Sequence, residues 1–216
     1  MKVVIFGNRD FAQLAHYYLR HETAKDEWYD VVGFTVHSEF MDSAEFDGLP
    51  VEPFEDVHSV WSPDEYQMFA PINYGEPRRQ QNIYDDIKQK GYKMPTYIHP
   101  SVNIPSVSSV GENCFILEDN TIQPFVTIGD NCVFWSGNHI GHHSVIDSHV
   151  MFTSHVVLSG HCKVESHSFF GVNATIRDGT TISEGTLVGM GSLVTKDTMP
   201  WWLYLGSPAA PKKQVV

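Results

Sequence analysis

Positive charge is scarce in this sequence. Its 216 residues include 14 Lys and Arg against 26 Asp and Glu, which gives a formal net charge of -12. A surface with this balance repels the phosphates of nucleic acids and of anionic lipids. We therefore expect neither a nucleic acid nor a membrane surface as a partner.

Cysteines, long hydrophobic runs and a secretion signal are lacking as well. The chain has 3 cysteines, an odd number that, without a secretion signal, does not indicate a disulfide framework. No apolar stretch approaches the roughly 20 residues that span a bilayer, and residues 1–6 begin a strand pattern rather than a signal peptide. The expected location is the cytoplasm. The length allows one large domain or two small ones.

An aliphatic residue or Phe recurs at every sixth position from Ile98 to Val194, which makes 17 consecutive hexads. This period fits neither the helical repeat nor the alternation of a flat strand. It fits a triangular coil of short strands with three hexads to a turn, so that residues 18 apart stack roughly 4.8 Å from one another. The sequence therefore predicts a parallel β-helix over residues 98–216, including a closing segment at its C-terminal end.

Two places within the hexad have their own preferences. The fifth is small or compact in most repeats and holds Cys114, Cys132 and Cys162, which predicts packed core thiols. The fourth is rich in Asn, Asp, Gly and His, the residue types enriched at positive φ, so we expect a left-handed turn residue there. It is occupied by Asn113, Asp119, Phe125, Asn131, Gly137, His143, His149, His155, His161, His167, Asn173, Gly179, Gly185, Gly191 and Asp197.

Histidines are unusually frequent, with 12 in the chain. Turn geometry alone explains the residue type at His149, His155 and His167, which we interpret as structural. His142 lies in the third place of its hexad, where this explanation does not apply, and Gly160 stacks on it 18 residues later. An imidazole beside an unobstructed backbone amide can act as a general base next to an oxyanion donor.

Residues 1–97 do not follow the six-residue repeat. Strand patterns over residues 2–6, 31–36 and 66–72 alternate with helical patterns over residues 11–20 and 78–90. This alternation predicts a small parallel sheet of half-Rossmann type. The chain is therefore expected to be an α/β domain over residues 1–97 that is followed by an all-β helix.

The turn after the first strand reads Gly7-Asn8-Arg9-Asp10 and holds one glycine of the phosphate-binding fingerprint, so a dinucleotide cofactor is not expected. Gly7 can serve as a turn glycine or as a phosphate contact. The crevice at the switch point of such a sheet, beside Gly7, Asn8, Phe34 and Asn73, can hold the nucleotide portion of a substrate.

A parallel-sheet module followed by hexapeptide repeats resembles the bacterial nucleotide-sugar acetyltransferases, the family of the bacillosamine N-acetyltransferases and the so-called sialic acid O-acetyltransferases. The resemblance covers nearly the whole chain. It implies a left-handed β-helix, a homotrimer, acetyl-CoA as co-substrate without a metal, and an N-terminal domain that binds the nucleotide of the sugar.

The resemblance also implies roles for individual residues. Residues 138–146 are similar to the family's stretch in which a histidine precedes an acidic residue, which makes His142 the general base. Gly160 matches the glycine whose amide binds the thioester oxygen. Gly206, Pro208 and Ala209 look like the family's Gly-x-Pro-Ala element, which closes the helix close to the coenzyme.

The same stretch resembles the UDP-N-acetylglucosamine O-acyltransferases of lipid A synthesis, in which histidines that match His139 and His161 help to hold substrate. His143 stacks on His161, and we assign it to substrate binding with them. The sequence also departs from the family pattern. His143 stands where the acidic partner of the base is expected, and residues 35–37 replace the aspartates that follow the second strand.

These observations predict N-acetylation of an amino group on a nucleotide-linked deoxysugar, as in polysaccharide biosynthesis. O-acetylation of a sugar hydroxyl is the closest alternative, because the same base and oxyanion donor would serve it. A γ-type carbonic anhydrase pairs two zinc ligands five residues apart, a spacing that the histidines of the repeat do not have. A non-catalytic scaffold is the remaining alternative.

Overall fold

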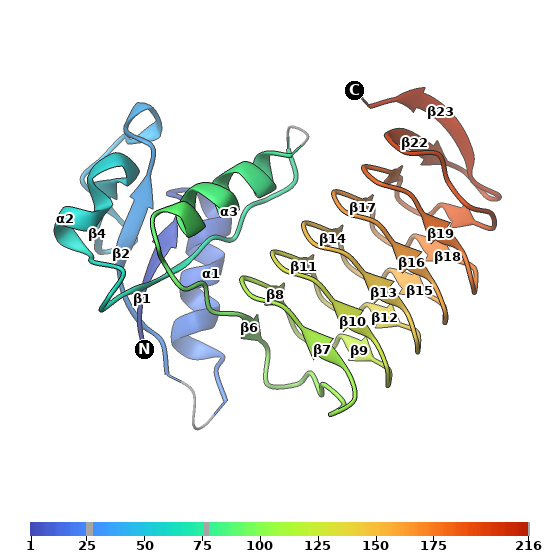
Figure 1. Cartoon of the computed structure of the whole chain (residues 1–216), viewed down its shortest axis with the longest axis horizontal. Helices are drawn as coiled ribbons and strands as arrows, with labels where there is room; N and C mark the ends of the chain where they lie inside the picture. Colours follow the sequence, from blue (N-terminus) through green and yellow to red (C-terminus); the bar gives the residue numbers. More distant parts are fainter. Residues whose placement is uncertain (25–27, 76–77, 216) are drawn as a thin grey trace.

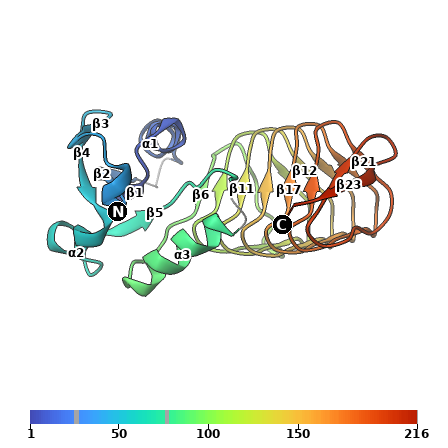
Figure 2. The same ribbon diagram turned by 90° about the horizontal axis from the view of Figure 1, so that it is seen from above.

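The structure is a computed structural model that describes residues 1–24, 28–75 and 78–215. An α/β part at the N-terminal end adjoins a long parallel β-helix (Figure 1). Seen from above, the coils stack away from the N-terminal sheet, and the last strands lie at the far end (Figure 2). The expected fold class is confirmed. We propose a division between the two parts near residue 97.

The N-terminal sheet has the strand order β3-β4-β2-β1-β5. Its parallel strands are β1 (Lys2–Phe6), β2 (Asp30–Val36), β4 (Leu49–Pro53) and β5 (Gln67–Phe69), and β3 (Glu45–Phe46) pairs antiparallel with β4. The helices are α1 (Asp10–His21), α2 (Val57–Val60) and α3 (Arg79–Gln89), with short 3-10 turns η1 (Ser38–Phe40) and η2 (Phe54–Asp56). The half-Rossmann arrangement is as expected, whereas β3 and β4 were not anticipated.

The strand β5 is shorter than the pattern over residues 66–72 predicts. The side chain of Asn113, from the β-helix, binds both backbone groups of Ala70: the Ala70 N–H donates to Asn113 Oδ1 at 2.9 Å, and Asn113 Nδ2 donates to the Ala70 carbonyl at 3.0 Å. Backbone groups that are satisfied in this way do not also pair in the sheet. A tertiary contact therefore ends the strand.

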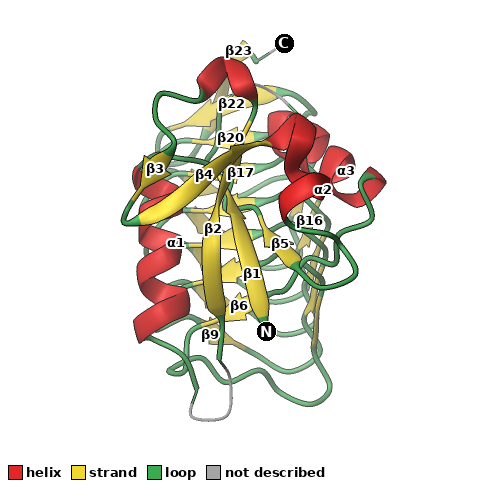
Figure 3. Ribbon diagram, turned by 90° about the vertical axis from the view of Figure 1, so that its left-hand side faces the viewer, coloured by secondary structure: helices red, strands yellow, loops and turns green. Residues whose placement is uncertain are grey.

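Side chains of β1 alternate between the two faces of the sheet. Val3 and Ile5 lie in a core with α1 that also includes Phe115 of the β-helix, whereas Val4 and Phe6 lie in a second core with α2 and α3. Figure 3 shows α1 on one side of the sheet and α2 and α3 on the other. The α1 core therefore extends into the first coils and joins the two parts.

The β-helix consists of two-residue strands arranged as three sides. The strands are β6 (Tyr97–Ile98), β7 (Ser109–Val110), β8 (Phe115–Ile116), β9 (Thr121–Ile122), β10 (Thr127–Ile128), β11 (Val133–Phe134), β12 (His139–Ile140), β13 (Val145–Ile146), β14 (Met151–Phe152), β15 (Val157–Leu158), β16 (Lys163–Val164), β17 (Phe169–Phe170), β18 (Thr175–Ile176), β19 (Thr181–Ile182), β20 (Leu187–Val188) and β21 (Leu193–Val194). We call the sheet with β8, β11, β14 and β17 side 1, the sheet with β9, β12 and β15 side 2, and the sheet with β10, β13 and β16 side 3. Parallel partners such as Thr127 and Val145 are 18 residues apart, which confirms the predicted coil.

The hexad that begins at Ile104 is an exception, because it forms no strand. In this column the residue after each strand donates its N–H to the next coil: Gln123 donates to Ile140 O at 3.0 Å and Gly141 donates to Leu158 O at 2.7 Å. The equivalent residue after Ile104 is Pro105, which has no N–H to donate. Ile104 still packs against the core, so its side chain points inward although its backbone does not pair with the next coil as a strand.

The fourth place of the hexad has positive φ from Asn113 to Gly191, as expected, and Phe125 shares this conformation with φ 65°. Asp197 does not, and here the prediction was wrong. The chain leaves the repeat at this point toward β22 (Trp202–Leu205). The Asp197 carboxylate instead accepts the Thr181 N–H at 2.8 Å.

One continuous core runs through the β-helix. The rings of Phe134, Phe152 and Phe170 stack in it, with centroid separations of 4.8 and 4.3 Å. All three cysteines are buried free thiols, as expected. Burial raises the pKa of the Cys162 thiol, which keeps it protonated and unreactive.

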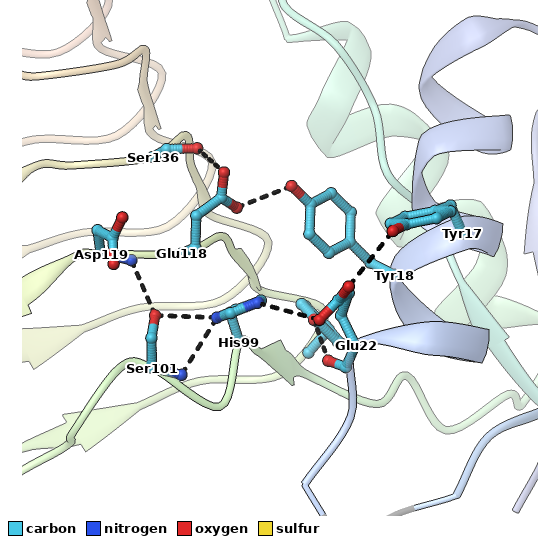
Figure 4. A network of polar contacts seen from close by, with 9 residues as sticks. Tyr17, Tyr18, Glu22, His99, Ser101, Glu118, Asp119 and Ser136 are labelled. Carbon is cyan, nitrogen blue, oxygen red and sulfur yellow. Dashed lines mark hydrogen bonds and ion pairs between the residues drawn. The ribbon is translucent and has the colours of Figure 1, made fainter.

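Polar contacts hold α1 against the first coils (Figure 4). The Tyr18 hydroxyl donates to Glu118 Oε2 at 2.7 Å, and the Ser136 hydroxyl donates to Glu118 Oε1 at 2.7 Å. Burial, together with Glu118, raises the pKa of Tyr18, so this hydroxyl remains a donor. Beside it, His99 Nε2 lies 3.8 Å from Glu22 Oε2. The contacts fix the orientation of the N-terminal part on the helix.

A hairpin closes the C-terminal end. β22 joins side 1 in parallel with β20, and β23 (Ala210–Gln214) returns antiparallel to β22. The hairpin supplies the closing segment that the sequence predicts without specifying its strands. In the described part of the chain, no helix is both long enough and apolar enough to cross a membrane.

Phe152 should be the most sensitive position of the aromatic stack, because it has a ring above and below it. Phe152→Ala is expected to lower the free energy of unfolding by about 3–5 kcal/mol, the usual cost of emptying a buried aromatic site. Urea denaturation followed by circular dichroism would measure the loss. As a control, Phe125→Asn replaces an exposed residue at a positive φ that Asn accepts, and it should change stability by less than about 0.5 kcal/mol. A similar loss in both variants would contradict the assignment of the core.

His149 should make stability depend on pH. Burial, with a contribution from His167, lowers its pKa to about 4. Histidine in an unfolded chain titrates near pH 6.5. Between about pH 6.5 and 4 this side chain therefore binds a proton in the unfolded state but not in the folded state. The free energy of unfolding consequently falls as the pH falls through this window. His149→Asn should reduce that fall by up to about 3 kcal/mol.

Urea denaturation at a series of pH values would test this expectation. His155→Asn is the matched control, because His155 occupies the same turn position with φ 61° but is exposed. If the two variants lose stability equally between pH 6.5 and 4, the burial of a neutral His149 is not the cause.

Candidate functional site

Three imidazoles meet at the edge between sides 2 and 3. His142 and His143 lie in the turn between β12 and β13, and His161 lies one coil further, between β15 and β16. All three side chains are exposed, and one ring nitrogen from each lies within 4.8 Å of the others. We call His142, His143 and His161 the histidine corner.

The repeat itself fixes the backbone of this corner. His143 and His161 hold the left-handed turn with φ values of 58° and 55°. The His161 N–H donates to the His142 carbonyl at 2.8 Å, which ties the two coils together. A Cβ at Gly141 would lie 2.5 Å from the Gly160 nitrogen, so the absence of a side chain at Gly141 lets the coils approach. The three histidines are therefore positioned by register, as the 18-residue period predicts.

The structure brings His142 and Gly160 together. A Cβ built on Gly160 would lie 2.8 Å from His142 Cε1 and 3.0 Å from Nε2, so the imidazole covers the position where other residues carry a side chain. Gly160 is buried, and its N–H has no hydrogen-bond acceptor among the described residues. This N–H is therefore available to a ligand, as are the N–H groups of most residues at the same place of the hexad, such as Ser154 and Asp178.

An acidic side chain continues the same column. A Cβ built on Gly160 would lie 3.0 Å from Asp178 Oδ1. Asp178 lies one coil after Gly160, whereas His142 lies one coil before it. The Asp178 carboxylate is exposed and makes no hydrogen bond or ion pair within the described residues. The column His142–Gly160–Asp178 thus offers a base, a free amide and a free carboxylate in succession.

No carboxylate orients the His142 ring in the described part of the chain. Its Nδ1 lies 3.1 Å from Nδ1 of His143, within hydrogen-bond distance. The rings of His142 and His161 meet edge to face at 5.0 Å, and those of His143 and His161 stack at 4.9 Å. The position that is acidic in the resembling family is therefore filled by a histidine that contacts the candidate base directly.

His139 lies beside this group but is not part of it. It belongs to β12 on side 2, where it pairs with Thr121 and Val157, and its side chain is partly exposed. It lies on side 2, three residues before His142 in the chain. We keep its role in substrate binding as a proposal.

A cavity of about 700 Å³ opens at the carboxyl ends of the N-terminal strands. Gly7, Asn8 and Asn73 line it, as the sequence predicts. Gly7 has φ 123° and donates its N–H to the Thr35 carbonyl at 2.7 Å, a conformation that a residue with a side chain rarely adopts. Asn8 Nδ2 donates to the Phe40 carbonyl at 3.0 Å, which fixes the turn at the rim.

Phe34 does not line this cavity. Its side chain is fully buried in the α1 core, where it contacts Phe46 and His16 edge to face. The expected contact with substrate is therefore wrong. Phe34 and Val36 point to the same face of β2, but Phe34 lies within the strand and is covered by the α1 core, whereas Val36 at the end of the strand and the following His37 reach the cavity.

Several cavity residues were not identified from the sequence. Arg9, His37 and Arg79 bring basic groups to the wall, and Tyr74 brings an aromatic ring that contacts Phe169 in a tilted arrangement at 4.6 Å. Burial raises the pKa of Tyr74, so its hydroxyl stays protonated. Of these residues, only Arg9 could have been expected at the cavity from the sequence, because it follows Gly7 and Asn8 in the same turn. Arg79 and Tyr74 come from distant segments that only the fold brings together.

The cavity and the histidine corner lie on different sides of the chain. The cavity residue Phe11 stacks on Trp135, which directly follows β11 of side 1, and the cavity residue Tyr74 contacts Phe169 of β17 on the same side. The histidine corner lies at the edge between sides 2 and 3, which is opposite side 1 in a triangular coil. Figure 1 shows side 1 nearest to α3, with β9, β12 and β15 on another side.

Gly206, Pro208 and Ala209 lie in the turn between β22 and β23. The Leu193 N–H donates to the Gly206 carbonyl at 3.0 Å, and the Ala209 N–H donates to the Leu193 carbonyl at 2.7 Å, so the turn closes the last coil. From Gly160 the column continues through Asp178 to Lys196, two coils or roughly 10 Å further toward this end. An extended ligand along the column would reach the closing turn.

Comparison with known proteins identifies the fold. A family model described as the GMPPB C-terminal domain matches residues 92–197. No curated protein sequence matches the chain. A mutant of perosamine N-acetyltransferase from Caulobacter crescentus, solved with CoA and GDP-perosamine, has a TM-score of 0.86 at 23% identity and covers 99% of this chain and 98% of its own.

Two further solved structures are similar over the same extent. The acetyltransferase domain of PglB from Neisseria gonorrhoeae, in complex with acetyl coenzyme A, has a TM-score of 0.84 at 19% identity over 98% of both chains. WeeI from Acinetobacter baumannii has a TM-score of 0.83 at 19% identity over 98% of this chain and 100% of its own. The expected resemblance to nucleotide-sugar acetyltransferases is thus confirmed as a likeness in fold: an N-terminal Rossmann-like part followed by a left-handed β-helix.

Proposed function

We propose that this protein is an acetyl-CoA-dependent N-acetyltransferase that acts on the amino group of a nucleotide-linked amino sugar. The observation that carries the proposal is the pair formed by His142 and the unpartnered amide of Gly160. Proteins of the same fold bind the corresponding ligands: the perosamine N-acetyltransferase was solved with CoA and GDP-perosamine, and the PglB domain was solved with acetyl coenzyme A.

The two groups would divide the reaction between them. His142 accepts a proton from the substrate ammonium, and the free amine adds to the thioester carbonyl. Negative charge that develops on the carbonyl oxygen is stabilised by the Gly160 N–H; removing one such donor typically costs about 2.7–4 kcal/mol. The C–S bond then breaks, the nitrogen of the adduct loses its second proton to solvent as the amide forms, and the coenzyme thiolate takes up the proton from His142. No covalent enzyme intermediate is required.

The cavity in the N-terminal part would hold the nucleotide. Arg9 and Arg79 supply positive charge for phosphates, next to the acidic Asp10 and Asp86, and Tyr74 supplies an aromatic surface for a base or a sugar. The donor coenzyme would extend from Gly160 toward the turn with Gly206, Pro208 and Ala209. His139, His143 and His161 would then contact the sugar or the thioester beside the base.

A homotrimer would complete the site. Within one chain the cavity faces side 1 while the histidine corner lies at the opposite edge, so the two are not adjacent. A neighbouring copy that packs its cavity toward this edge would place the sugar beside His142. Bringing both substrates into one groove converts a bimolecular encounter into an oriented reaction.

His142→Ala is expected to lower turnover by ~100-fold or more, the typical contribution of a positioned general base. Thiol release from acetyl-CoA would be followed with a panel of nucleotide-linked amino sugars and their hydroxyl analogues. His155→Asn removes an exposed histidine at a different edge and should leave turnover unchanged. Equal activity in the two variants would remove His142 from the mechanism, and preference for the hydroxyl analogues would indicate O-acetylation instead.

Gly160→Ala should separate the amide from its base without unfolding the coil. The new methyl group would lie within 3.0 Å of His142 Nε2 and of Asp178 Oδ1, both on side chains that can move, so the ring is displaced while the backbone stays. Since misplacing a reacting group by about 1 Å can cost ~100-fold, we expect a loss of ~10- to 100-fold in turnover.

The matched control is Gly179→Asn. Gly179 has open space around it and φ 68°, which Asn accepts, so stability and turnover should both be retained. Unfolding temperatures of the two variants would confirm that they are folded. Full activity of folded Gly160→Ala would exclude a tight pairing of amide and imidazole.

A further inference from the structure

We propose that the histidine corner binds one zinc ion, and that the bound ion inhibits acetyl transfer by preventing His142 from accepting a proton. The binding claim stands on the geometry of His142, His143 and His161 alone. The claim of inhibition rests on the proposed function. Zinc is here a competing ligand of the site and takes no part in the reaction.

The spacing of the nitrogens suits a tetrahedral ion. Zinc–imidazole bonds of about 2.0–2.1 Å at tetrahedral angles separate two ligand nitrogens by about 3.3 Å. His142 Nδ1 and His143 Nδ1 are 3.1 Å apart, and one ring nitrogen of each of the three histidines lies within 4.8 Å of the others. The rings have to rotate to direct three nitrogens at one ion, which their exposed positions allow.

The backbone holds these ligands ready. His143 and His161 occupy equivalent left-handed turns of successive coils, and the His161 N–H is bonded to the His142 carbonyl at 2.8 Å. The Cα positions are therefore fixed by the same ladder that fixes the whole helix. Binding orders only three exposed side chains, which keeps the entropic cost small.

The chemistry of the group selects the metal. All three ligands are imidazole nitrogens, which suit zinc, copper and nickel, whereas magnesium and calcium prefer oxygen. The three side chains are exposed, so an ion reaches them directly from solvent. A set of three protein ligands leaves one tetrahedral position for water, as in open zinc sites.

Occupation of the corner prevents His142 from acting as the base. An imidazole that binds zinc through one nitrogen carries its hydrogen on the other, so neither nitrogen can accept a proton. A cation beside His142 also repels the substrate ammonium. A chelator should therefore reverse the inhibition.

Calorimetric titration of the untagged, full-length protein with zinc sulfate tests the binding claim. We expect one ion per chain, with affinity reduced at least 10-fold in His143→Asn and in His161→Asn. Asn is compatible with the positive φ at both positions, so the variants should fold, which circular dichroism would verify. His155→Asn removes a histidine from an equivalent turn on another edge and should bind like the wild type. Absence of binding, or equal binding in all variants, would overturn the site.

A second titration with magnesium chloride should show no binding, and binding equal to that of zinc would contradict an imidazole site. Acetyl transfer by the wild type, measured as amide product rather than as free thiol because zinc binds thiols, should fall as zinc fills the site and recover with EDTA. Zinc binding without inhibition would overturn the second claim. If no substrate is acetylated, the proposed function fails, and the calorimetry still decides the zinc site.

Discussion

Parallel hydrogen bonds between successive coils determine where every functional group of the β-helix lies. Coils are joined in both directions: Gly141 donates its N–H to Leu158 of the next coil at 2.7 Å, and His161 donates to His142 of the preceding coil at 2.8 Å. A residue is thereby stacked on the residue 18 positions earlier. The alignment of the imidazole, the free amide and the carboxylate in the column His142–Gly160–Asp178 is a direct consequence.

The same turn geometry serves two purposes at two edges of the helix. Between sides 3 and 1, Asn131 Nδ2 lies 2.9 Å from His149 Nδ1, and His149 stacks on His167 at 5.3 Å beneath the N-terminal part. Burial lowers the pKa of His149 to about 4 and makes it a neutral structural residue. Between sides 2 and 3, His143 and His161 have the same backbone conformation but remain exposed. The covering domain, and not the residue type, separates structural histidines from those available for chemistry.

The N-terminal part also explains why one chain does not complete the proposed site. Its α1 core merges with side 1 through Phe115, and Tyr18 and Glu118 fix its orientation. The cavity is therefore held rigidly on side 1, away from the histidine corner. Under the proposed function, assembly is the means by which both substrates meet, because neither part moves across the helix without breaking this core.

The sequence by itself determined the coil, the left-handed turns, the buried cysteines and the pairing of His142 with Gly160, since all of these follow from a period that acts locally and repeats. It also predicted Gly7, Asn8 and Asn73 at the cavity, because the ends of parallel strands meet at one edge. Only the tertiary structure decided that Phe34 turns into the core and that Tyr74 and Arg79 join the cavity. Those outcomes depend on which surface covers which side chain, and contacts between distant segments leave no periodic signal in the sequence.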